Sequence, residues 1–205
     1  MITYIFGAAH IDNYEYLEKI DFSDSFIICA DGGIRHIERL GLTPAVYIGD
    51  FDSSVNDEKY SNKIVYPAEK DDTDLGLAIN YAAEHGLNKC VAIGCLGGRI
   101  DHTYANFSLI KYAYEKNVQL KLIDEKSCIF AVGGHCEIRK EGYKYISIFP
   151  CGEKATGITL RGFKYSLADA ELDHSFPLGV SNQLIEDKAY IEVKNGLLLI
   201  MMVKE

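Results

Sequence analysis

Aspartate side chains recur where the first half of the sequence is expected to leave a strand. Asp31 follows the apolar run 26–30, and other aspartates follow the runs 46–48, 64–66 and 91–93. Loops after parallel strands meet at one edge of a sheet, where ligands bind. Gathered carboxylates repel one another without a cation, and Mg²⁺ is a hard ion that prefers oxygen ligands and phosphates. The pattern predicts a Mg²⁺–phosphate site with these members: Asp31; Asp50 and Asp52; Asp71, Asp72 and Asp74; and Asp101.

Two glycine pairs lie at the same expected edge, each before a helix. Gly32-Gly33 follows Asp31, and Gly97-Gly98 precedes Arg99. Glycine lets backbone N–H groups approach phosphate oxygens, a helix N-terminus favours anions, and arginine adds a two-pronged donor. Neither a P-loop nor a G-x-G-x-x-G motif occurs, which argues against those two kinds of nucleotide site.

Several of these polar residues have a plainer interpretation. A lone aspartate after a strand is usually a turn former or helix cap, and only the recurrence favours a site. Thr73 is best read as an N-cap, with Asp74 stabilised by the helix dipole. Lys70 could neutralise phosphate or remain solvated. His102 could serve as an acid–base group, although a histidine on a helix surface is the simpler reading.

The elements that must position these residues change character along the chain. Up to residue 124, strands alternate with helices, which predicts a Rossmann-like α/β domain with a parallel sheet. From residue 125 onward, short apolar runs are separated by glycine turns such as Gly133-Gly134, and Asn195-Gly196 is typical of a hairpin. We expect an α/β nucleotide-binding domain over 1–124 and a β-sandwich over 125–205. The expected helices are 14–20, 34–40, 74–85 and 101–116.

Composition restricts the classes of function. The 205 residues carry a net charge of −9 and no dense Lys/Arg tract, which argues against a nucleic-acid partner. No signal peptide and no membrane-spanning run is evident, so we expect a soluble cytoplasmic protein with no membrane partner. The six cysteines show no C-x-x-C spacing and are expected as free thiols, with Cys29 and Cys90 buried in strands.

Four motifs occur in order along the first half of the sequence: Ala30-Asp31-Gly32-Gly33, Ile48-Gly49-Asp50-Phe51-Asp52-Ser53, Lys70-Asp71-Asp72-Thr73-Asp74 and Gly97-Gly98-Arg99-Ile100-Asp101-His102. Together they resemble the motifs of the thiamine pyrophosphokinase family. Later segments, Gly162-Phe163-Lys164-Tyr165 and Gly179-Val180-Ser181-Asn182, are similar to further motifs of that family, so the resemblance covers most of the chain. Many members continue the first motif as Asp-Gly-Gly-Ala-Asn, whereas Ile34-Arg35 stands here, and Tyr165 matches a position that is Trp in some relatives.

The resemblance implies a reaction and a set of roles. Thiamine and Mg²⁺-ATP would react to give thiamine diphosphate and AMP, in a homodimer whose sites form between two subunits. Sequence alone does not choose Asp71 or Asp101 as the proton acceptor. The implied metal ligands are Asp50, Asp52 and Asp71; the implied catalytic residues are Asp71, Asp74, Arg99 and Asp101; the implied nucleotide contacts are Asp31, Gly32, Gly33, Thr73, Gly97, Gly98 and His102; and the implied thiamine contacts are Tyr165, Ser181 and Asn182.

Three other functions remain open at this point. Asp50-Phe51-Asp52-Ser53-Ser54 superficially fits the D-x-D-x-T motif of haloacid dehalogenase phosphohydrolases, but it follows the third expected strand rather than the first. A non-catalytic nucleotide or thiamine sensor would not need so many carboxylates. A structural dimer module would leave the polar motifs without a purpose.

Overall fold

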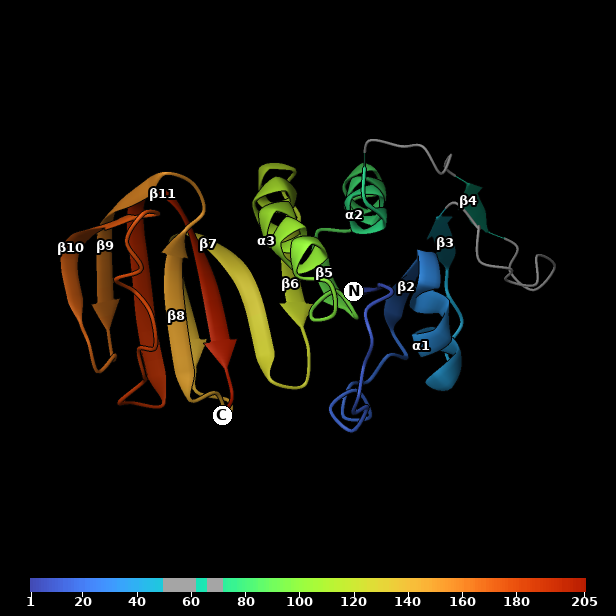
Figure 1. Ribbon diagram of the computed structural model, residues 1–205, viewed down its shortest axis with the longest axis horizontal. Coiled ribbons are helices and arrows are strands. Elements are labelled where there is room, and N and C mark those ends of the chain that lie inside the picture. The colour runs from blue at the N-terminus through green and yellow to red at the C-terminus, as the bar shows by residue number, and fades with distance from the viewer. Residues whose placement is uncertain (50–61, 66–71) are drawn as a thin grey trace. The chain divides into compact units, whose positions relative to one another are not determined.

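The chain divides into two compact units, Met1–Glu125 and Lys126–Glu205 (Figure 1). The computed structural model describes residues 1–49, 62–65 and 72–205. Within those residues, no helix is both long enough and apolar enough to cross a lipid bilayer.

The first unit is built on a parallel sheet with the spatial order β6-β5-β1-β2-β3-β4. Such a sheet places the loops after its strands at one edge, as the alternation of strands and helices predicted. The strands are β1 (Ile2–Phe6), β2 (Ser25–Ala30), β3 (Val46–Gly49), β4 (Lys63–Val65), β5 (Lys89–Ile93) and β6 (Gln119–Ile123).

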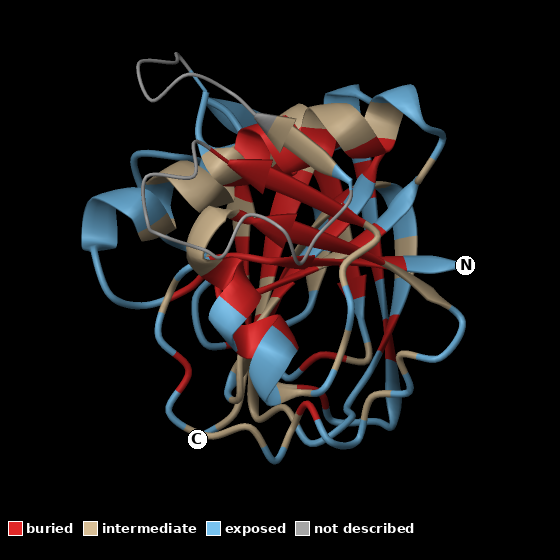
Figure 2. Ribbon diagram, turned by 90° about the vertical axis from the view of Figure 1, so that its right-hand side faces the viewer, coloured by how far each residue is buried: buried red, intermediate tan, exposed pale blue. Residues whose placement is uncertain are grey.

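Helices cover both faces of this sheet. Phe6 of β1 and Cys29 of β2 share a buried cluster with Ile37 of α1 (Ile34–Arg39). Neighbouring strand residues point to the opposite face, and there the Phe26 ring stacks on Tyr81 of α2. Burial on two faces explains why these strands are almost continuously hydrophobic, and Figure 2 shows them as a buried layer. In the described part of this unit, the further α-helices are α2 (Asp74–Glu84) and α3 (Ile100–Glu115), and a 3-10 turn, Asp31–Gly33, precedes α1.

The helix expected over residues 14–20 is absent, and that prediction was wrong. The segment forms successive turns, in which Leu17 N–H donates to the Tyr14 carbonyl and Ile20 N–H donates to the Leu17 carbonyl. Leu17 is fully buried against the first unit's core. A short segment with few backbone hydrogen bonds is thus held by tertiary packing instead of by helix formation.

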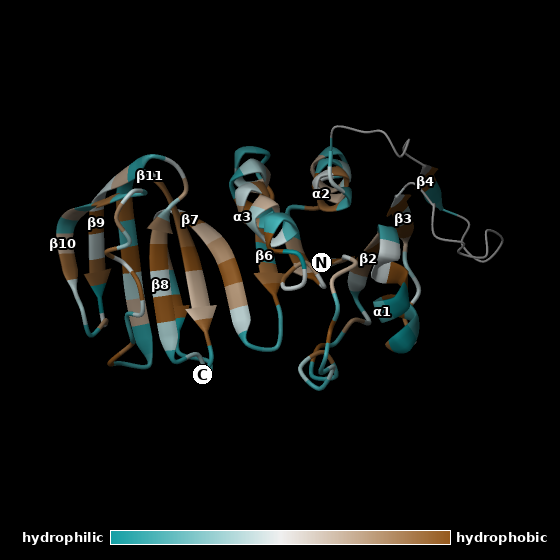
Figure 3. Cartoon of the chain, in the orientation of Figure 1, coloured by the Kyte–Doolittle hydropathy of each residue, from teal (hydrophilic) through white to brown (hydrophobic). Residues whose placement is uncertain are grey.

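The second unit contains only β-strands, which are antiparallel to one another. Its central strand, β11, pairs with β7 along one side and with β9 and then β8 along the other, while β10 flanks β9. Figure 3 shows hydrophobic and hydrophilic bands along these strands, and alternate residues of β8 are buried. The strands are β7 (Ser127–Arg139), β8 (Tyr145–Pro150), β9 (Lys154–Arg161), β10 (Leu167–Asp173) and β11 (Lys188–Val203).

Asn195-Gly196 does not form a hairpin, and that prediction was wrong as well. The pair lies inside β11, and Gly133-Gly134, expected as a turn, lies inside β7. The register between the two strands shifts from Val193 to Leu198, which makes a bulge at this place. Gly196 has φ +93, and a Cβ there would lie 3.1 Å from the Lys154 carbonyl oxygen. Glycine therefore allows β11 to bend where its neighbour changes from β9 to β8.

All six cysteines are described, and each is a free thiol. Cys29 in β2 and Cys90 in β5 are buried, as predicted. Burial raises the pKa of Cys90 to about 12, so this thiol stays protonated at neutral pH and acts as a small apolar side chain.

Candidate active site

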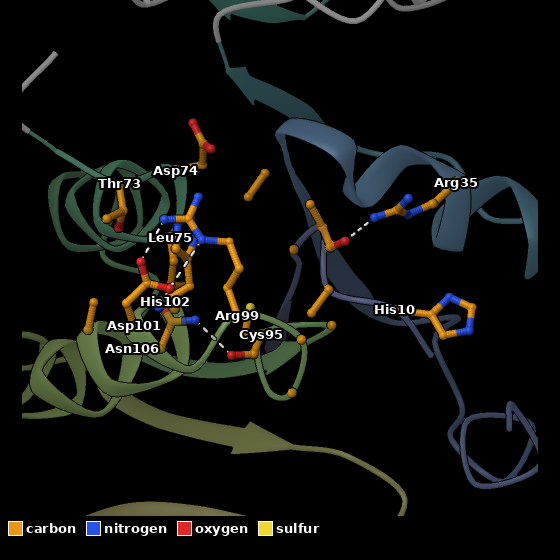
Figure 4. A pocket seen from close by; sticks show the side chains of 18 residues that line it. His10, Arg35, Thr73, Asp74, Leu75, Cys95, Arg99, Asp101, His102 and Asn106 are labelled. Atoms are coloured by element: carbon orange, nitrogen blue, oxygen red, sulfur yellow. Dashed lines mark hydrogen bonds and ion pairs between the residues drawn. The ribbon is translucent and has the colours of Figure 1, made fainter. Parts of the chain in front are cut away.

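A cavity of about 710 Å³ lies at the carboxyl edge of the first unit's sheet (Figure 4). Several segments contribute to its wall, together with the starts of α2 and α3: residues 7–10 after β1, Ala30 at the end of β2, and residues 94–95 and 97–99 after β5. The structure therefore brings together seven of the predicted site residues: Thr73, Asp74, Gly97, Gly98, Arg99, Asp101 and His102.

Arg99 and Asp101 form a two-pronged ion pair at the start of α3. Arg99 Nε donates to Asp101 Oδ1 at 3.1 Å, and Arg99 Nη2 donates to Oδ2 at 2.6 Å. The hydrogen bonds from Arg99 lower the pKa of Asp101 to about 2, and the same pairing raises the pKa of Arg99. Asp101 is thus fully ionised at neutral pH and a weak proton acceptor, whereas its hold on the guanidinium aims Arg99 at the cavity.

The start of α2 supplies the second polar group of the wall. Thr73 has an extended backbone, and its hydroxyl accepts a hydrogen bond from Gly76 N–H at 3.1 Å. This confirms Thr73 as the N-cap. Asp74 follows in the first turn, where the helix dipole stabilises a carboxylate. A capped, fixed helix start therefore presents Asp74 at the cavity.

The loop between β5 and α3 is held by side chains of the helix that follows it. Asn106 Nδ2 donates to the Cys95 carbonyl at 2.7 Å, and the Thr103 hydroxyl donates to the Gly97 carbonyl at 3.2 Å. Gly97 and Gly98 have φ of +79° and +68°, which only glycine adopts without strain. The glycines let the loop turn, and the helix fixes where it turns.

A buried histidine supports the opposite part of the wall. His36 is 1 % exposed, and its Nε2 lies 2.9 Å from the Ala9 carbonyl oxygen while its Nδ1 meets the Tyr14 hydroxyl. A carbonyl only accepts, so Nε2 carries the proton and Nδ1 accepts from Tyr14. Desolvation lowers the pKa of His36. The neutral ring therefore fixes the position of the loop after β1 through its hydrogen bond to the Ala9 carbonyl.

The loops after β1 and β5 also touch each other directly. Gly7 N–H donates to the Ile93 carbonyl, and Ala9 N–H donates to the Gly94 carbonyl, both at 2.8 Å. A Cβ on Gly7 would lie 2.6 Å from the Cys95 sulfur, and one on Gly94 would lie 2.7 Å from the Gly7 carbonyl oxygen. Two glycines are therefore required for the floor of the cavity to close.

Three predicted nucleotide contacts, Asp31, Gly32 and Gly33, do not line the cavity, although Ala30 and Arg35 on either side of them do. Asp31 has φ +45, and its carbonyl accepts from the Tyr47 hydroxyl at 2.9 Å. Gly33 is buried, and a Cβ there would lie 1.9 Å from the Phe6 carbonyl oxygen. For Gly33 the structure thus supplies a packing reason, namely close contact with β1.

The predicted metal ligands Asp50, Asp52 and Asp71, together with Lys70, lie outside the described residues. Among the residues that are described, no group of three or more His, Cys, Asp or Glu side chains is arranged to hold a metal ion. Of the carboxylates that the structure describes, Asp74 and Asp101 line the cavity, and Asp101 is already paired with Arg99.

The three predicted thiamine contacts lie together in the second unit. The Tyr165 side chain is 60 % exposed, and Asn182 is buried. Asn182 Oδ1 accepts from Tyr165 N–H at 3.0 Å, and Asn182 Nδ2 donates to the Tyr165 carbonyl at 2.7 Å. The neighbouring Ser181 is exposed, with φ +59, and its N–H donates to the Ser147 hydroxyl at 3.0 Å. Asn182 therefore fixes the backbone that carries an exposed aromatic ring.

Sequence reasoning missed several residues of the cavity wall. Arg35 was noted only as a departure from a motif, and Asn106 sits in the middle of a helix where nothing local marks it. The run Gly7-Ala8-Ala9 did carry a signal, because small residues directly after a buried strand are typical of close backbone approach. His10 also lines the cavity, and its Nε2 lies 3.2 Å from Asp12 Oδ1.

Comparison with protein families gives two matches in chain order. Residues 17–122 match the family described as thiamin pyrophosphokinase, catalytic domain. Residues 135–198 match the thiamin pyrophosphokinase, vitamin B1 binding domain. The catalytic match includes every described residue of the cavity lining except Gly7, Ala8, Ala9 and His10.

Individual relatives agree with the family match. The thiamine pyrophosphokinase of Bacillus subtilis is 32 % identical over 182 residues, covering 85 % of each chain. A crystal structure of thiamine pyrophosphokinase from Bacillus subtilis aligns with a TM-score of 0.87 and 29 % identity, covering 100 % of this chain and 99 % of that one. The corresponding structure from Geobacillus thermodenitrificans gives 0.86 and 26 %, with 100 % and 98 % covered. The chain therefore belongs to the thiamin pyrophosphokinase family.

Proposed function

We propose that this chain is a thiamine diphosphokinase, which transfers the pyrophosphoryl group of ATP to the hydroxyl of thiamine and releases AMP. One observation carries the proposal: the Gly97–Asp101 motif and the start of α2 meet at one cavity, in a chain whose two halves match the catalytic and vitamin B1 binding domains in order. A cavity lined by guanidinium groups and helix starts suits a polyphosphate.

Each unit takes one substrate in this proposal. The unit 1–125 serves as a Rossmann-like nucleotide-binding domain, with ATP phosphates at Gly97, Gly98 and Arg99 and with His102 beside them. The unit 126–205 serves as a β-sandwich that binds thiamine through the Tyr165 ring and Ser181. Because both ends of the Asn182 amide bond the Tyr165 backbone, Asn182 acts on thiamine by holding Tyr165 in place.

The reaction needs positioning more than covalent help from the protein. The thiamine oxygen forms a bond to the β-phosphorus of ATP, the bond from that phosphorus to the α-bridging oxygen breaks, and AMP leaves with that oxygen. Negative charge shifts toward the α-phosphate, and a fixed guanidinium such as Arg99 stabilises it. Asp101 keeps Arg99 oriented, because it forms both prongs of the ion pair.

In our proposal the proton of the thiamine hydroxyl goes to an acceptor other than Asp101, because both oxygens of the Asp101 carboxylate already bind Arg99. A carboxylate whose pKa is lowered to about 2 has little drive to take a proton at pH 7. We therefore assign this role to Asp71. Replacing Asp101 with Asn should lower kcat through a misplaced Arg99 while leaving the acidic limb of the kcat–pH profile where it was. A shift of that limb in the Asp101→Asn variant would instead identify Asp101 as the proton acceptor.

Mg²⁺ completes the site in our proposal, with Asp50, Asp52 and Asp71 as its ligands. β3 ends at Gly49, so Asp50 follows directly on a strand of the parallel sheet. When bound, the ion neutralises the phosphate oxygens of ATP. Removing divalent cations with EDTA should abolish turnover, and added Mg²⁺ should restore it. Near-normal turnover of Asp50→Asn at saturating Mg²⁺ would contradict the metal role.

One coupled assay separates this proposal from its rivals. The full chain is incubated with ATP and Mg²⁺, with and without thiamine, and both AMP and inorganic phosphate are measured. AMP formed only with thiamine supports the diphosphokinase. Phosphate released without thiamine indicates a phosphohydrolase, and binding of ATP without any product indicates a sensor. Binding of neither substrate would leave the structural dimer module.

The proposal also includes a homodimer in the cytoplasm. Tyr165 and other large apolar side chains of the second unit are exposed, Phe176 to 67 % and Leu178 to 58 %. Exposed apolar groups of this size are typical of association surfaces. Sedimentation at micromolar protein should give the mass of two chains, and a single chain would contradict the dimer.

A further inference from the structure

Arg35 is held at the cavity wall by a neutral partner. It belongs to α1 and lines the cavity, and its Nη2 donates to the Ala8 carbonyl in the loop after β1. That contact uses one of the five N–H donors of a guanidinium. Within the part of the chain that the structure describes, Arg35 forms no ion pair, and no described carboxylate balances its positive charge.

The other guanidinium of the cavity, that of Arg99, does form an ion pair. Arg99 is paired in two places with the Asp101 carboxylate. Of the two arginines, Arg35 is therefore the one whose charge no described carboxylate compensates, while Arg99 contributes an oriented donor whose charge is balanced by Asp101. An anion in the cavity gains more Coulomb energy from the uncompensated group.

The two arginines approach the cavity from different sides. In Figure 4, Arg35 and His10 lie on one side, while Arg99, Asp101, Thr73 and Asp74 lie on the other. The Arg35 side contributes small residues, among them Ala8, Ala9 and Ala30, which leave room beside the guanidinium. A phosphate chain between the two sides could accept N–H bonds from both.

We propose that Arg35 is a phosphate-binding residue for the polyphosphate co-substrate, acting from the wall that faces Arg99. The inference rests on the proposed function and adds a residue to it. Charge-assisted bonds from a guanidinium to phosphate oxygens are among the stronger polar contacts, and their geometry is two-pronged. Ala8 holds the side chain in advance, which lowers the ordering cost of binding.

The test is binding of ATP to the full-length protein, measured by calorimetry with Mg²⁺ and again with EDTA. Arg35→Gln should weaken ATP binding at least 10-fold in both conditions. The difference from the wild type should shrink as ionic strength rises, because salt screens the Coulomb attraction. Arg35→Lys should keep part of the affinity, because it retains the charge and loses the fork. The KM for thiamine should stay within twofold of the wild type.

Arg39→Gln is the matched control, because Arg39 belongs to the same helix, stacks over the Tyr14 ring and does not line the cavity. It should bind ATP like the wild type. ATP affinity of Arg35→Gln within twofold of the wild type, with intact circular dichroism, would overturn the inference. Failure of the proposed function shows differently: the wild type would then form no AMP with thiamine, whatever Arg35 contributes to ATP binding.

Discussion

The Asn182 side chain bridges the N–H and the carbonyl of Tyr165, at 3.0 Å and 2.7 Å, across 17 positions of sequence. Asn182→Ala should lower the free energy of unfolding by about 1–3 kcal/mol, since two hydrogen bonds to the Tyr165 backbone are lost. The KM for thiamine should rise about 10-fold. Tyr165→Phe keeps the backbone and the ring, and should cost less than about 0.5 kcal/mol. Equal urea midpoints for Asn182→Ala and the wild type would refute this bridging role.

The two glycines after Asp31 should respond very differently to a methyl group. At Gly33 a Cβ would lie 1.9 Å from the Phe6 carbonyl oxygen, so the backbone must move, and Gly33→Ala should cost more than about 3 kcal/mol. At Gly32 the nearest atom is the Ala8 Cβ at 3.1 Å, and Gly32→Ala should cost about 1 kcal/mol or less. The denaturant midpoints of the two variants give the comparison. Equal midpoints would show that the backbone of β1 can shift to accommodate a methyl group at position 33.

His36 should make stability depend on pH just below neutrality. Burial lowers the pKa of His36 in the folded chain. Just below pH 6.5 the imidazole is therefore protonated in the unfolded chain but still neutral in the folded chain. This contribution to stability is present above pH 6.5 and is lost as pH falls toward the folded pKa. His36→Gln should flatten the curve of unfolding free energy between pH 5 and 6.5, whereas Tyr14→Phe, which leaves the ring buried, should keep its slope. An unchanged slope in His36→Gln would assign the effect to other groups.

Local signals in the sequence identified the parts of the site that local structure creates. Thr73 was predicted as a cap because a threonine before an acidic first turn bonds the helix it begins, and it does so. Arg99 and Asp101 stand two positions apart, and their pairing needs only the turn that Gly97 and Gly98 permit. The strands of the first unit were visible because burial on both faces makes them uniformly apolar.

Contacts between distant segments were not predictable in this way. His36 meets Ala9 across 27 positions, and Arg35 meets Ala8 across the same separation. Each depends on α1 packing beside the loop after β1, which no short window encodes. The hairpin predicted at Asn195-Gly196 was wrong for a related reason. A two-residue turn motif does not show that β7 pairs with β11 before and after the bulge.

Asp31 offers a test that separates function from stability. Its φ of +45 lies in the left-handed region, which costs about 1 kcal/mol for a residue with a side chain. Asp31→Gly should therefore fold as well as the wild type or up to about 1 kcal/mol better, while Asp31→Ala should fold less well than Asp31→Gly. If the carboxylate serves the nucleotide site, both variants should lose at least 10-fold in kcat/KM for ATP. Thermal unfolding and steady-state rates on the same samples decide it, and full activity in Asp31→Gly would leave this aspartate a turn residue whose carbonyl holds Tyr47.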